Sequence, residues 1–208
     1  LPFYILKSVI ENQYNQPLDQ LIQQHFYNPL GANMSTYNPL DKFQKKYIIP
    51  TEIDNYYRND KVQGYVHDMG AAMQGGIGGH AGLFSNSNDV AKMMQLFIQQ
   101  GNYGDKRYFS SKTFNRFNFC HYCEQNNRRG IGFDKPQLGN KGPTCGCLSM
   151  ESFGHSGFTG TYAWADPDKE IVYVFLANRT FPKSDSNRLL KENIRTEIQR
   201  LIYKSIVE

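Results

Sequence analysis

Phe153-Gly154-His155-Ser156-Gly157-Phe158-Thr159-Gly160-Thr161 is the stretch that decides the fold, because it leads directly into two strand-like runs. Those runs are YAWA at residues 162–165 and EIVYVFLA at residues 170–177. The segment DPDK at 166–169 joins them and has proline at the second position, which suits a type I turn. The sequence therefore predicts a β-hairpin preceded by a turn of small residues, where the backbone can approach a ligand closely. Because the second run is apolar on both faces, we expect that strand to be central or well covered.

Helical periodicity surrounds this hairpin. Apolar residues recur at helical spacing in residues 3–14, 18–26, 90–98 and 190–206, and Ser110-Ser111 can cap a short helix that ends near Phe119. We expect the first two helices to pack together and the last one to lie across the sheet. Residues 31–64 and 124–149 predict long irregular connections. The predicted class is α+β in one partial domain, residues 1–208. It has a mainly helical part with loops over about 1–119, and a loop, the C-terminal strands and a helix over about 120–208.

Composition excludes several classes of protein. The 208 residues carry a formal net charge of +4, and the Lys and Arg residues are spread out, so nothing supports nucleic-acid binding. The longest apolar run, Ile171–Ala177, is far shorter than the roughly 20 residues that a membrane-spanning helix needs. The opening LPFYILKSVIE lacks the features of a signal peptide. Since the first residue is Leu1, we expect the chain to be a piece of something longer.

Several motifs follow one another in a recognisable order. They are PLG at 29–31, GYVHD at 64–68, GGIGGHAGLFSNSNDVAKM at 75–93 and GHSGFTGTYAWADPDKEIVYVFLANR at 154–179, followed by the closing amphipathic helix. This order resembles the serine β-lactamase and penicillin-binding-protein family, nearest to its class C and esterase-like branch. It is especially similar to the β-lactamase-like domain fused behind a family 3 glycoside hydrolase in Bacteroidetes proteins. The resemblance implies a β-lactamase/transpeptidase-like fold and an exported, periplasmic or secreted protein.

The resemblance also implies a catalytic site. In such enzymes a serine of an S-x-x-K motif is acylated, a Y-x-N motif assists proton transfer, and a Lys-Thr-Gly strand motif or its His variants closes the site. His155-Ser156-Gly157 matches the third motif. By resemblance, His155 would polarise or shuttle protons, Ser156 would bind the acyl substrate together with Gly157 and Thr159, and the Phe158 N–H would supply half of an oxyanion hole. A strand histidine bonded to a neighbour is the structural alternative for His155.

Two of the three motifs have no match. No serine in the sequence has a lysine three residues later, and we take Tyr57-Arg58-Asn59 as a chance Y-x-N because the family motif precedes the first helix of this chain. The chain is therefore expected to be the C-terminal part of the family fold and nearly inactive alone. Its partner would be the N-terminal remainder of that fold. Because the family sheet takes strands from both chain ends, we also expect an unpaired edge, an uncovered helix face and self-association.

Glycines and histidines elsewhere leave two alternatives each. Gly79 and His80 lie in the densest glycine cluster, which is either an anion cradle or, as we favour, a tight turn that borders the cleft. His67-Asp68 is either a base with its orienting carboxylate or a structural turn, and adjacent residues rarely face each other.

The four cysteines, Cys120, Cys123, Cys145 and Cys147, form a CxxC and a CxC. The exported family favours disulfides over free thiols, and an all-sulfur zinc site is the remaining alternative. Neither the motifs nor the resemblance implies a cofactor.

Two hypotheses follow. The first is a C-terminal segment of a serine acyl-hydrolase that opens an ester, a β-lactam or a peptide-like amide, acting on a small-molecule or cell-wall-derived substrate. The second is a non-catalytic accessory module of a glycoside hydrolase that holds cell-wall sugar or peptide, with the aromatic-rich 37–65 connection as its binding surface.

Overall fold

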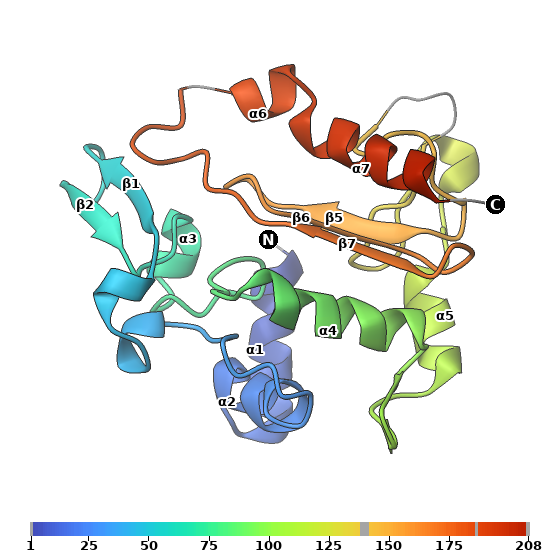
Figure 1. Cartoon of the computed structure of the whole chain (residues 1–208). Coiled ribbons are helices and arrows are strands. Elements are labelled where there is room, and N and C mark those ends of the chain that lie inside the picture. Colours follow the sequence, from blue (N-terminus) through green and yellow to red (C-terminus); the bar gives the residue numbers. More distant parts are fainter. Residues whose placement is uncertain (1, 138–141, 186, 207–208) are drawn as a thin grey trace. The chain divides into compact units, whose positions relative to one another are not determined.

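The computed structural model describes residues 2–137, 142–185 and 187–206, which form two compact units (Figure 1). Unit 1 contains residues 1–89 and 178–186, and unit 2 contains residues 90–177 and 187–208. The division expected near residue 119 separates a mainly helical part from the C-terminal strands and helix, whereas the contacts group residues 90–119 with those strands. The class is α+β, and within these described ranges the strands form three separate antiparallel sheets. No helix in the described ranges is long and apolar enough to cross a membrane.

Unit 1 begins with helices and ends with an irregular segment, residues 178–185, that returns to it. Its elements are α1 Pro2–Tyr14, α2 Leu18–Ile22, the π-helical turn Gln23–Tyr27, the 3-10 turns Pro39–Asp41 and Lys45–Tyr47, β1 Pro50–Asp54, β2 Asp60–Gln63 and α3 Met69–Ala72. Both helices expected at the start of the chain are confirmed. The apolar stripe of α1, however, faces outward, since Ile5, Leu6 and Val9 are all at least half exposed.

The hairpin β1–β2 lies in the segment for which the sequence predicts an irregular connection. Glu52 pairs with Val62 and Asp54 with Asp60 across the two strands. The returning segment 178–185 binds the other edge of β1, where the Thr180 hydroxyl donates to the carbonyl of Thr51 at 2.7 Å and the Ile53 N–H donates to the carbonyl of Pro182 at 2.9 Å. The prediction missed β1 because its two acidic side chains are buried, whereas acidic residues ordinarily indicate a surface.

Unit 2 is built on the sheet that the hairpin predicts. Its elements are α4 Ser87–Ile98, whose first turn belongs to unit 1, β3 Asn102–Tyr103, β4 Lys106–Arg107, α5 Ser111–Asn118, the 3-10 turn Cys123–Gln125, β5 Phe153–Ser156, β6 Tyr162–Asp166, β7 Ile171–Phe175, α6 Arg188–Lys191 and α7 Ile194–Ser205. The strands lie in the order β5-β6-β7. The central strand is therefore β6. The expectation that β7 is central or well covered is wrong for the described residues, because β7 is an edge strand whose residues are mostly half-buried.

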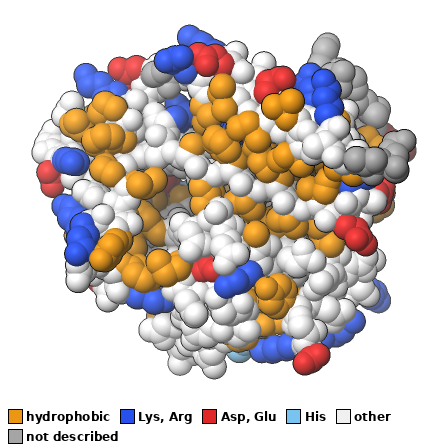
Figure 2. Space-filling view, in the orientation of Figure 1, with side chains coloured by type: hydrophobic (Ala, Val, Ile, Leu, Met, Phe, Trp, Pro, Cys, Tyr) orange, Lys and Arg blue, Asp and Glu red, His pale blue; other side chains and the backbone are white. Residues whose placement is uncertain are grey.

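Two cores cover the two faces of this sheet. On one face Phe153 and Ala165 pack with Met94 of α4 and Phe114 of α5. On the other face Tyr162, Trp164 and Tyr173 pack with Ile202 of α7, which confirms that the C-terminal helix lies across the sheet (Figure 1). Figure 2 shows hydrophobic side chains at the surface over α7 and the sheet. The packing fixes the ends of β5, where the candidate site residues lie.

Candidate functional site

The candidate site is the end of β5 and the turn that follows it. The register pairs His155 with Ala163 and Ser156 with Tyr162, so both residues lie at the last pairs of the β5–β6 ladder. The Gly157 N–H donates to the Thr161 carbonyl at 2.8 Å and closes the turn. Strand alternation puts His155 on the face of the buried Phe153, beyond the edge of that core. The segment therefore presents a basic side chain and a hydroxyl from a firmly paired strand.

Gly154 shows why this strand end needs a glycine. A Cβ at this position would meet Cγ of the Trp164 ring at 2.5 Å and would also overlap the Ala163 carbonyl oxygen. Trp164 is almost fully buried and cannot move aside. The glycine therefore lets β5 and β6 approach closely next to His155.

His155 lies between a carbonyl oxygen and a carboxylate. Its Nδ1 is 2.8 Å from the Ser156 carbonyl oxygen, and because a carbonyl only accepts, Nδ1 carries the proton. Its Nε2 is 3.9 Å from Oδ2 of Asp134, an ion-pair distance when the imidazole is protonated. Asp134 also pairs with Arg129 at 2.9 Å. The imidazole can therefore exchange a proton at Nε2 while its orientation is held.

Sequence reasoning did not identify Asp134. Its backbone binds the outer edge of β5 in both directions, donating its N–H to the Gly154 carbonyl at 2.8 Å and accepting the Gly154 N–H at 3.1 Å. Asp134 lies in the irregular segment 124–149, where neither periodicity nor a motif marks it.

The other predicted site residues of this segment are accessible. Phe158 is 62% exposed, Gly157 is exposed, and Ser156 and Thr159 are half-buried. The structure places Ser156 at the end of β5 and the other three in the turn that follows it, and the roles of all four stay predictions.

Gly79 and His80 belong to unit 1, whereas His155 belongs to unit 2. The Nε2 atom of His80 lies 2.8 Å from Oδ1 of Asp68, and the His80 ring stacks on Tyr4 of α1 with centroids 4.5 Å apart. A Cβ at Gly79 would overlap the Phe3 carbonyl oxygen, so this turn packs tightly against α1.

The partner of Asp68 is therefore His80 and not the adjacent His67. Burial alone would raise the pKa of Asp68, but the Ala71 N–H that it accepts at the start of α3 and the pairing with His80 hold it below its usual value. Because this partner is distant in sequence, the spacing of residues gives no signal for it.

A buried charged cluster supports the residues before Asp68. Arg58 binds Asp54 at 2.8 Å and Glu52 at 2.9 Å, and it donates to the His67 carbonyl at 3.2 Å. Both carboxylates are nearly fully buried. Burial would raise the pKa of Asp54, but the Arg58 guanidinium and three backbone N–H groups hold it well below its usual value. A paired arginine in this position fixes the chain that leads to Asp68.

The four cysteines form two short-range disulfides in the structure. Cys120 is joined to Cys123 and Cys145 to Cys147, with Cα atoms 5.6 Å and 5.4 Å apart. In the described part of the chain no three His, Cys, Asp or Glu side chains converge as metal ligands would.

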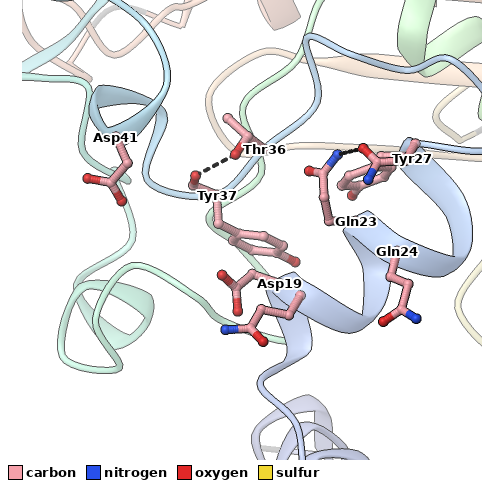
Figure 3. Close-up of a pocket in the computed structure, with 9 residues that line it drawn as sticks. Asp19, Gln23, Gln24, Tyr27, Thr36, Tyr37 and Asp41 are labelled. Atoms are coloured by element: carbon pink, nitrogen blue, oxygen red, sulfur yellow. Dashed lines mark hydrogen bonds between the residues drawn. The ribbon is translucent and has the colours of Figure 1, made fainter.

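A polar cavity of about 370 Å³ lies beside α2 in unit 1 (Figure 3). It is lined by amides, two carboxylates and two tyrosines, and the residues are Asp19, Gln20, Gln23, Gln24, Tyr27, Asn28, Thr36, Tyr37 and Asp41. In Figure 3 the Asp19 carboxylate lies beside the ring of Tyr37. Burial and the Asp19 charge raise the pKa of Tyr37, and Oδ1 of Asp19 is buried without a hydrogen-bond partner among the described residues. This lining suits a ligand rich in hydrogen-bond donors.

Comparison with known proteins gives a consistent result. A family model described as Beta-lactamase matches residues 3–194. A curated protein of Escherichia coli O157:H7 named "Putative D-alanyl-D-alanine carboxypeptidase" is 34% identical over 190 residues, which cover 85% of this chain and 43% of that protein. A protein of the same name from Salmonella enteritidis is also 34% identical, over 85% of this chain and 44% of its own length. The chain thus spans less than half the length of the curated relatives it matches.

Solved structures share the fold at low sequence identity. A β-lactamase from Mycobacterium bovis superposes with a TM-score of 0.57 at 15% identity, over 91% of this chain and 61% of that one. A penicillin-binding-protein homologue from Caulobacter crescentus gives a TM-score of 0.55 at 13% identity, over 85% of this chain and 50% of that one.

Proposed function

Because the chain belongs to the beta-lactamase family, as the match over residues 3–194 shows, we propose that it is the C-terminal segment of a serine acyl-hydrolase. In this proposal a serine outside these 208 residues attacks a carbonyl carbon, the leaving group departs with a proton, and water then hydrolyses the acyl-enzyme. No serine in this sequence has a lysine three residues later, which supports a site whose nucleophile lies outside these 208 residues and whose strand motif lies within them.

The observation that carries the proposal is the placement of His155 and Ser156 at the open end of β5. With Nδ1 held by the Ser156 carbonyl, Nε2 is the atom that would give a proton to the leaving group or take one from it. Asp134, whose Oδ2 is 3.9 Å from Nε2, would stabilise the imidazolium that exists while His155 holds the extra proton. The Ser156 hydroxyl would bind the acyl substrate, and the Phe158 N–H would donate to the developing oxyanion.

The names of the curated relatives support a peptide substrate over an ester. Both are described as D-alanyl-D-alanine carboxypeptidases, which makes a peptide-like amide that ends in D-alanine the substrate class we propose. A β-lactam would then act as a slowly released acylating agent.

The test uses a longer chain that supplies the S-x-x-K serine. His155→Ala should lower the rate of acylation or deacylation with a fluorescent penicillin by about 10²–10⁴-fold, the usual contribution of a general acid or base. His121→Ala is the matched control, since His121 is an exposed histidine of the same unit that contacts the Arg116 carbonyl and the Phe119 ring and lies outside the β5 turn. Unchanged rates in a folded His155→Ala protein, with Ser156→Ala also unchanged, contradict the proposal.

The cavity of Figure 3 favours a second candidate, the non-catalytic binding module. Its amides and tyrosines border the aromatic-rich 37–65 connection at Tyr37. Amide side chains both donate and accept, as the recognition of sugar hydroxyls requires. Saturable binding of a cell-wall oligosaccharide that is lost in Gln24→Ala, together with an unreactive longer chain, would favour this module over the hydrolase.

We further propose an exported location and fusion behind a family 3 glycoside hydrolase. The two disulfides support an oxidising compartment, and the motif order at residues 64–93 and 154–179 supports the fusion. Fractionation of producing cells and the sequence ahead of Leu1 test these two points separately.

A further inference from the structure

A second cavity, of about 450 Å³, lies at the other end of the unit 2 sheet. It is lined by the CxC loop, by Lys169 of the β6–β7 turn, and by Arg200, Tyr203 and Lys204 at the end of α7. The sheet register places this turn next to the Asp166–Ile171 pair, whereas the candidate active site lies beyond the opposite ends of β5 and β6. This cavity is therefore distinct from the site at His155.

The charge of the cavity has one sign. Among the described residues that line it, three side chains are cationic and none is acidic. In residues 2–137, 142–185 and 187–206, neither Lys169 nor Lys204 has an ion-pair partner, and Arg200 has one pair, to Glu197 at 3.4 Å, with both side chains about half exposed. Such an exposed pair contributes little and leaves the guanidinium free to turn toward a ligand.

The Nε atom of Arg200 gives an independent indication. It is buried and has no hydrogen-bond partner in the part of the chain that the structure describes. A buried donor without an acceptor is costly, and an anion in the cavity would remove that cost. The planar guanidinium can bind an oxyanion through two parallel N–H groups, with the lysines as point charges beside it.

The walls of the cavity are held in place before any ligand arrives. The Cys145–Cys147 disulfide closes the loop, and the Cys145 N–H donates to the buried side chain of Gln199 at 3.0 Å. Tyr203 donates its hydroxyl to the buried Asp166 at 2.7 Å, which fixes the ring as a wall. The Asp166 carboxylate also accepts hydrogen bonds from Ser149, so its negative charge is partly neutralised and repels an anion in the cavity only weakly.

We propose that this cavity binds a small doubly charged oxyanion, namely phosphate or the phosphate group of a monoester. Three cations without strong partners favour two negative charges over one. The volume leaves room for a small organic group against the Tyr203 ring. This inference stands apart from the proposed hydrolase, because none of its residues belongs to the His155 segment.

The experiment titrates the 208-residue chain with inorganic phosphate at constant ionic strength. Calorimetry and the chemical shifts of backbone amides in NMR spectra monitor the binding. A parallel titration with glycerol phosphate distinguishes a free anion from a monoester. We expect one saturable site, with the largest shifts at Gly146 and in the last turn of α7. Arg200→Gln combined with Lys204→Gln should weaken binding by about tenfold or more.

Arg188→Gln is the matched control, since Arg188 is an exposed arginine of the same unit whose ion pair to Glu192 lies outside the cavity. Lys169→Gln, in an exposed turn, gives a second test if the double variant does not fold. The proposal is overturned if phosphate does not saturate the chain, if Arg188→Gln weakens binding as much as the double variant, or if folded Lys169→Gln and the double variant both bind as the unaltered chain does.

Discussion

His80 and Asp68, twelve residues apart, are joined by a 2.8 Å contact between Nε2 and Oδ1, and that carboxylate also caps α3. One side chain thus fixes the glycine-rich turn and starts a helix. The stacked Tyr4 ring ties the same turn to α1. The geometry of this turn therefore depends on one carboxylate remaining charged.

We predict that Asp68→Asn lowers the free energy of unfolding at pH 7 by less than about 1 kcal/mol, because the carboxylate is partly exposed. Asn caps a helix as well as Asp does, so the loss of unfolding free energy measures the contribution of the carboxylate charge. The folded-state pKa of Asp68 is lowered, so this contribution is present above the unfolded pKa and is lost as the pH falls through the folded pKa. Urea unfolding at pH 7 and at a series of lower pH values checks this. A difference that does not shrink as the pH falls, or an equal effect of Asp105→Asn, contradicts it.

Lys135 gives a prediction at alkaline pH. Burial lowers its pKa to about 8, while Nζ donates to Asn118 and to the Glu151 carbonyl. Between pH 8 and about 10 the unfolded chain binds a proton at Lys135 that the folded chain lacks, so the Lys135 contribution to stability should become more favourable by about 1–2 kcal/mol. Urea unfolding of the unaltered chain and of Lys135→Met at several pH values measures this contribution as the difference between the two. A difference that does not change with pH refutes the assignment.

Gln199 links α7 to the sheet and to the CxC loop. Its Oε1 accepts from the Tyr162 hydroxyl and from the Cys145 N–H, both at 3.0 Å. Gln199→Leu leaves two buried donors unpaired, and each should cost about 1–3 kcal/mol of unfolding free energy. Tyr162→Phe should therefore cost less in the Gln199→Leu background than in the unaltered chain. Strict additivity in this double-mutant cycle would show that the hydrogen bond has no energetic role.

The exposed stripe of α1 predicts self-association. Ile5, Leu6 and Val9 are 59%, 50% and 52% exposed, and apolar surface of this kind is rarely left uncovered in solution. Light scattering should give a mass above 24.0 kDa that rises with concentration. Leu6→Lys with Val9→Lys should restore the monomer, whereas Gln99→Lys with Asn115→Lys, which adds the same charge at exposed polar positions outside α1, should not. A monomer at every concentration is the opposing result.

The sequence predicts those parts of the fold whose signals are local. The helix α4 follows from its apolar stripe and from the caps around it, since the Asn86 side chain accepts the Asp89 N–H and Gly101 adopts a positive φ. The hairpin β6–β7 follows from two strand-like apolar runs and from the turn at Pro167 that joins them. Both are confirmed because neighbouring residues determine them.

What the sequence did not predict depends on distant partners. The strand β1 buries Glu52 and Asp54 only because Arg58 and backbone groups pair with them. The contact between Asp134 and His155 and the position of β7 at a sheet edge likewise arise from packing between segments far apart in the chain. No pattern within one segment carries that information.

The most direct test of the central claim is the intact mass of the pure 208-residue chain after incubation with a fluorescent penicillin, beside a longer chain that carries an S-x-x-K serine. The account predicts an adduct of one probe on the longer chain and an unchanged mass for the 208 residues alone. A stoichiometric adduct at a serine within these 208 residues, or no adduct on either chain, would contradict it.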